Sequence, residues 1–157
     1  MNLNSSFNGD DNLYVRLKSG NHDSWSDTKS NYNTYLSAAN GNGDALKVDK
    51  IWYTTPISEN QTIWIGPKIE NYYMHATAPS IYKPILKQFT LGGNGAAYGA
   101  STKTGAGYAF KDDSGFAFST NVVTAGNSTS GVLTEESVTS WANQIGYTKD
   151  QYSASLM

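Results

Sequence analysis

The chain has 157 residues, enough for one domain with a hydrophobic core, and carries a formal net charge of −2 from 11 basic and 13 acidic side chains. It has no basic stripe, which argues against nucleic-acid binding, and no cysteine, which excludes disulfides and cysteine-ligated zinc. Only 38% of the residues are hydrophobic and 15% charged, whereas glycine, polar and aromatic residues are frequent. This composition favours many strands and turns over helices.

Eight strands in four hairpins are predicted along the chain, each pair closed by a short turn rich in Asn, Asp, Gly or Ser. The connections between hairpins, residues 20–44, 74–103 and 125–139, are much longer. This alternation of short turns and long loops is what a transmembrane β-barrel requires. The predicted strands are residues 1–7, 12–19, 45–57, 62–73, 104–111, 116–124, 140–148 and 151–157.

The strand predicted at residues 62–73 is long for a soluble domain, where about five or six residues are usual. Its alternation places Ile63, Ile65 and Ile69 on one face and Trp64, Lys68 and Glu70 on the other. Apolar residues oppose polar or small ones with the same period in strands 12–19, 116–124, 140–148 and 151–157. One face of the predicted sheet is therefore apolar along most strands, and the other is polar.

Strand 45–57 departs from this rule, because Ile51 falls among the polar positions. A β-bulge near Lys50 would restore the alternation. The alternative is that this stretch packs against another protein segment. Both ends of the chain stop inside alternating runs, so the chain is expected to be a fragment of a longer protein, without signal peptide or peptidoglycan-binding segment.

Several segments resemble the carbohydrate-selective porin family, in the order seen in cyanobacterial outer-membrane porins. The matching motifs are the hairpin from Leu3 to Leu17, the strand from Trp52 to Pro56, and the Gly66–Pro67 step. The resemblance implies that residues 1–157 form about half of a sixteen-strand-type transmembrane β-barrel, an all-β antiparallel up-and-down meander. It also implies passive diffusion of small hydrophilic solutes or ions, with carbohydrates among the candidates.

In such a barrel the apolar parity, including Ile63, Ile65 and Ile69, would face outer-membrane lipid, and the polar parity would face a water-filled lumen. Charged side chains on a pore wall set ion preference. A homotrimer is one of the assemblies open to the full-length protein, whose oligomeric state the sequence does not determine, and no cofactor or metal is expected. The predicted pore-lining residues are Arg16, Lys18, Lys47, Asp49, Trp64, Lys68 and Glu70.

The long connection around residues 78–100 is apolar for an exposed loop. One interpretation is that it folds into the lumen, where Tyr82, Lys83, Lys87 and Phe89 would form a constriction. The alternative is that it packs on the barrel rim or on a neighbouring subunit.

No catalytic or metal-binding constellation is evident, so an enzyme is not expected. His22 and His75 are expected to be solvated surface residues. The alternative function is a soluble β-sandwich that binds carbohydrate or builds a fibre, with Trp25, Tyr32 and Tyr35 available to stack on sugar. A sandwich would bury the face carrying Ile63 and Ile65 in a core. Half of a larger barrel would instead leave a curved open sheet whose edges are residues 1–7 and 151–157.

Overall fold

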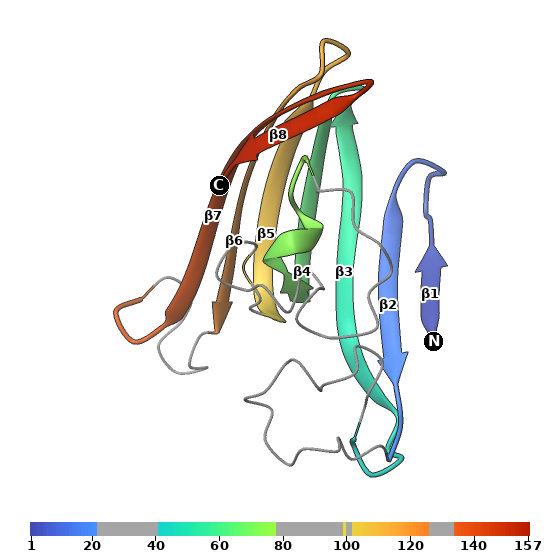
Figure 1. The fold of residues 1–157 in the computed structure, drawn as a ribbon. Helices are drawn as coiled ribbons and strands as arrows, with labels where there is room; N and C mark the ends of the chain where they lie inside the picture. The colour runs from blue at the N-terminus through green and yellow to red at the C-terminus, as the bar shows by residue number, and fades with distance from the viewer. Residues whose placement is uncertain (22–40, 78–98, 100–101, 126–133) are drawn as a thin grey trace.

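The computed structural model describes residues 1–21, 41–77, 99, 102–125 and 134–157. These residues form one antiparallel sheet of eight strands in the order in which they follow in the chain, so the predicted all-β meander is confirmed (Figure 1). The strands are β1 (Asn2–Ser5), β2 (Asn12–Lys18), β3 (Lys47–Ser58), β4 (Gln61–Glu70), β5 (Thr102–Lys111), β6 (Phe116–Ala125), β7 (Val138–Lys149) and β8 (Tyr152–Leu156).

The sheet is open and curved (Figure 1). Among the described residues β1 pairs with β2 alone and β8 with β7 alone, so these two strands are the edges that the sequence predicts. A short 3-10 helix, η1 (Asn71–Tyr73), follows β4 and lies against one face of the sheet. We call this face the inner face and the opposite one the outer face.

Alternation assigns the central strands to these two faces as predicted. In β6, Ala117, Ser119 and Asn121 are buried on the inner face, while Phe116 is exposed. In β7, Gln144 is buried and Trp141 is 72% exposed. Residues that oppose one another in paired strands lie on the same face. The register between strands therefore gives the face of each residue in the neighbouring strands as well.

A β-bulge lies next to Lys50, as predicted for the strand that breaks alternation. Arg16 pairs with Lys50 and Leu17 with Val48, so Asp49 is the additional residue of β3. The bulge keeps Lys50 on the inner face and Ile51 on the outer one. It thereby restores the alternation along the rest of the strand.

A second bulge in β4 overturns two predictions from the sequence. Ile65 pairs with Tyr53 and Lys68 with Ile51, so Gly66 and Pro67 together oppose Trp52. Lys68 therefore lies on the outer face, not on the lumen side as predicted. Ile69 is fully buried on the inner face, not exposed to lipid.

Gly66 permits this bulge because the two strands approach closely. A Cβ atom at Gly66 would lie 2.5 Å from the Cβ of Trp52 and 2.6 Å from the carbonyl oxygen of Ile51. Pro67 has no N–H to donate to the ladder, which suits the additional position of a bulge. Strand β4 ends at Glu70, so the predicted strand end at residue 73 is wrong, because Tyr72 and Tyr73 belong to η1.

The turn between β1 and β2 is organised by the carboxylate of Asp11, which is 5% exposed. It accepts hydrogen bonds from the hydroxyls of Ser6 (2.5 Å) and Tyr53 (2.6 Å) and from the backbone N–H groups of Phe7 (2.8 Å) and Asn8 (3.1 Å). These bonds, that of Ser6 most of all, hold the pKa of Asp11 far below its usual range.

This lowered pKa predicts a pH-dependent contribution of Asp11 to stability. A folded-state pKa below the unfolded value of about 4 stabilises the fold above that pH, and the gain disappears as the pH falls toward the folded-state pKa. Asp11→Asn should therefore lower the urea midpoint near neutral pH, and its difference from the wild type should shrink in acid. Asp10→Asn, at the exposed neighbouring position, is the control. Parallel pH profiles for wild type and Asp11→Asn would contradict the assignment.

Candidate functional site on the inner face

The inner face buries large polar side chains beside a small apolar cluster of Trp52, Ile69, Met74 and Val123. The largest fully buried side chains include Lys50, Asn71 and Gln144, each at most 1% exposed. Large apolar side chains are exposed instead, among them Ile65 at 61%. Lysine is almost never fully buried unless it is paired, so the inner face must satisfy these polar groups internally.

Residues 71–77 cross the inner face over β5, β6 and β7 and are held there by side chains of the sheet. The amide of Asn71 donates to Oδ1 of Asn121 at 2.7 Å. The backbone N–H of Ala76 donates to the hydroxyl of Ser119 at 3.1 Å. These bonds satisfy polar groups of both the crossing segment and the sheet.

Gln144 makes the most complete of these connections. Its Oε1 accepts from the backbone N–H of Thr77 at 3.0 Å, and its Nε2 donates to the Thr77 carbonyl at 2.6 Å. The absence of side chains at Gly107 and Gly146 lets the segment lie close to the sheet. A Cβ atom there would meet Met74 at 2.7 Å and Thr77 at 2.4 Å, respectively. We call residues 71–77 the inner strap.

A charged cluster lies beside the inner strap, on β2, β3 and the end of β4. Arg16 and Lys18 contact the carboxylate of Asp49, with N–O distances of 2.5 Å and 3.5 Å. Lys50 forms an ion pair with Glu70. Opposite charges thus neutralise one another where the cluster is least exposed.

Two tyrosines of the inner strap cover Lys50. The ammonium group donates to the hydroxyl of Tyr72 at 3.0 Å and lies 5.1 Å and 4.7 Å from the ring centres of Tyr72 and Tyr73. Burial, reinforced by Tyr73, raises the pKa of Tyr72, so its hydroxyl stays neutral. The anionic partner of Lys50 is therefore Glu70, and the rings add cation–π attraction.

Six of the seven predicted pore-lining residues lie on or beside the inner face, and the seventh lies on the outer face. Arg16 and Lys18 lie opposite Lys50 and Lys47, and Trp64 packs against the buried cluster that contains Trp52. Asp49 and Glu70 reach the cluster from the bulge of β3 and the end of β4. Lys68 is the residue on the outer face. The predicted constriction residues Tyr82, Lys83, Lys87 and Phe89 lie outside the described residues, as do His22, Trp25, Tyr32 and Tyr35.

Sequence reasoning missed Lys50, Asn121, Gln144 and the inner strap as parts of this site. Because a bulge shifts the alternation of β3 at Asp49, the sequence pattern alone does not show on which face Lys50 lies. A signal for Asn121 and Gln144 did exist, since both are amide side chains with small residues near them on the same parity: Ala117 and Ser119 in one strand, Ala142 and Gly146 in the other. Such a face has room for an inserted backbone segment, and its amides can pair with that segment.

His75 lies in the inner strap, where it is partly exposed and its Nδ1 is 3.4 Å from the amide of Asn121. It is therefore not simply a solvated surface histidine as predicted. The described segments contain no group of three or more His, Asp or Glu side chains placed to hold a metal ion. None of them forms a helix long and apolar enough to cross a membrane.

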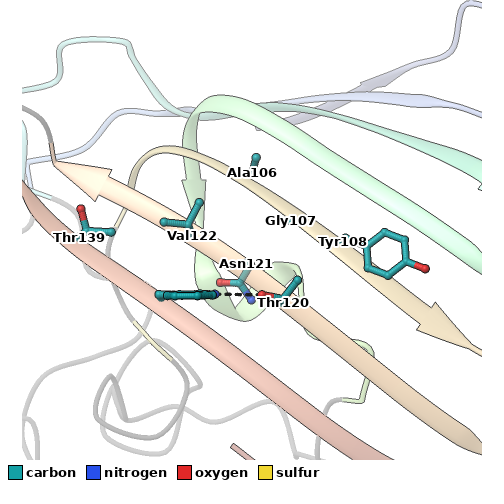
Figure 2. A pocket seen from close by; sticks show the side chains of 8 residues that line it. Ala106, Gly107, Tyr108, Thr120, Asn121, Val122 and Thr139 are labelled. Carbon is teal, nitrogen blue, oxygen red and sulfur yellow. Dashed lines mark hydrogen bonds between the residues drawn. The ribbon is translucent and has the colours of Figure 1, made fainter. Parts of the chain in front are cut away.

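The outer face carries a shallow apolar groove of about 510 Å³ over β5, β6 and β7 (Figure 2). The indole N–H of Trp141 donates to the hydroxyl of Thr120 at 3.0 Å. This bond satisfies the polar end of Trp141, so the rest of the ring contributes to the apolar outer surface. The groove is lined by Ala106, Gly107, Tyr108, Thr120, Asn121, Val122, Thr139 and Trp141.

Comparison of the chain with protein-family models, characterised proteins and solved structures finds no match. The resemblance to porins therefore depends on the motif residues named above.

Proposed function

We propose that the chain forms part of the wall of an outer-membrane pore that lets small hydrophilic solutes or ions diffuse passively. The observation that carries this proposal is that large apolar side chains are exposed on the outer face of the sheet while large polar ones are buried on the inner face. A transmembrane barrel places apolar side chains toward lipid and polar ones toward its lumen. Here Trp141, Ile65 and Ile145 are 72%, 61% and 54% exposed on one face, while Lys50 and Gln144 are buried on the other.

The strand lengths and connections support the same proposal. Strands β3 and β7 have 12 residues each, and β4, β5 and β6 have 10 each. A tilted strand of about 9–11 residues crosses the hydrocarbon layer. All four hairpin turns lie at the same end of the sheet, as the short periplasmic turns of a barrel do (Figure 1).

The open edges support a wall larger than this sheet. In the proposed pore, further strands pair with the free edges of β1 and β8, because unpaired backbone groups cannot be left in lipid. The charged cluster also favours a water-filled interior. Arg16, Lys18 and Asp49 are paired but keep 22%, 39% and 27% of their side-chain surface exposed, which suits contact with water.

The decisive experiment is a conductance measurement. The polypeptide as the cell produces it is purified in detergent and added to planar bilayers, where the proposal expects stepwise increases in conductance. Absence of such steps, together with a protein that stays soluble and monomeric without detergent, would overturn the pore. That outcome would favour the alternative, a β-sandwich module whose second layer covers the face bearing Ile65 and Trp141.

A further inference from the structure

The charges of the described residues are segregated between strands and connections. Every basic residue in the described ranges lies in a strand, whereas nine of the eleven acidic residues there lie in turns or loops. Asp49 and Glu70 are the two acidic residues in strands. The sheet is therefore strongly cationic, although the chain as a whole has a net charge of −2.

The register places most of this positive charge on the inner face. Lys103 pairs with the buried Ile69 and Lys111 with the buried Ala117, so both share the inner face. Lys68 and Lys149 belong to the outer face, where they pair with Ile51 and Tyr152. Among the described residues, the six inner-face cations are Arg16, Lys18, Lys47, Lys50, Lys103 and Lys111.

Within the part of the chain that the structure describes, two carboxylates oppose these six cations. Asp49 pairs with Arg16 and Lys18, and Glu70 pairs with Lys50. Lys47, Lys103 and Lys111 are exposed, and within the described residues no carboxylate forms an ion pair with any of them. The inner face thus has an excess of positive charge that remains available to solutes.

We propose that the pore prefers anions, because its wall presents this excess of uncompensated lysines on the inner face. The inference rests on the proposed function and names the class of solute. Charge of one sign along a water-filled channel attracts counter-ions and raises their local concentration. Rings of Lys or Arg are the usual wall of anion-conducting pores.

The test compares two matched double variants in planar bilayers with a KCl gradient. The wild-type reversal potential should be shifted from zero toward the equilibrium potential of chloride. Lys47→Gln/Lys103→Gln should lower the chloride-to-potassium permeability ratio by about twofold or more. Lys68→Gln/Lys149→Gln removes the same charge from the outer face and should leave the ratio unchanged.

The outcomes separate the inference from the function on which it rests. Wild-type channels that prefer potassium would overturn the anion preference but would still support the proposed pore. Equal loss of preference in both double variants would overturn the assignment to the inner face. Absence of any channel would overturn the proposed function itself. Anion preference that weakens at high ionic strength would support the lysine wall, because salt screens exposed charges.

Discussion

Lys50→Met is expected to destabilise the fold by about 3–5 kcal/mol, the cost of removing one partner of a buried ion pair. Lys50 is 1% exposed, and its partner Glu70 has a side chain that is 14% exposed. Methionine keeps much of the volume and the packing under Tyr72 and Tyr73 but removes the positive charge. The Glu70 carboxylate is then left with the hydroxyl of Thr102 but without its buried cation.

The measurement is urea-induced unfolding of the protein in detergent micelles or lipid vesicles, followed by tryptophan fluorescence. Trp52 is a suitable local probe because its ring centre lies 4.7 Å from that of Tyr73 in the inner strap. Lys68→Met, on the outer face and exposed, is the control and should cost far less. The double variant Lys50→Met/Glu70→Gln should recover a large part of the loss, because both charges are then absent. A double variant no more stable than Lys50→Met would contradict the ion-pair account.

Gln144→Leu is expected to release the end of the inner strap from the sheet. The substitution leaves the backbone N–H and carbonyl of Thr77 buried without their partners, and each unsatisfied group costs about 1–3 kcal/mol. Leucine has a similar volume, so the loss arises from these two hydrogen bonds, together with the one that Ser119 donates to Oε1 of Gln144 at 3.3 Å, and not from a cavity. The strap should open locally because this costs less than unfolding the sheet.

Amide hydrogen exchange distinguishes local opening from global loss of structure. In Gln144→Leu the amides of Ala76 and Thr77 should exchange much faster, while those of β5 and β6 keep their protection. Asn143→Leu changes the neighbouring residue of β7, which is exposed on the outer face and accepts from Thr120, and should leave the strap protected. Unchanged exchange at Ala76 and Thr77 in Gln144→Leu would show that other contacts hold the strap.

The sequence by itself determined the strands, the hairpins and, for most residues, the face of the sheet on which the side chain lies. Alternation is a local property, since each residue lies on the face opposite to that of its neighbour. Buried Ser119 and exposed Trp141 could therefore be assigned from a few adjacent letters. The turns were equally local, because Asp, Asn and Gly residues favour them through their own backbone preferences.

Only the tertiary structure decided where alternation is interrupted and what covers the inner face. The bulge at Gly66–Pro67 depends on the register with β3 and β5, and it exchanges the faces of Lys68 and Ile69. The partner of Thr77, Gln144, is 67 residues away in the chain. The partner of buried Lys50 is set by the two bulges together with the end of β4. Such pairings are determined by the register and curvature of the whole sheet, and no short segment of sequence carries that information.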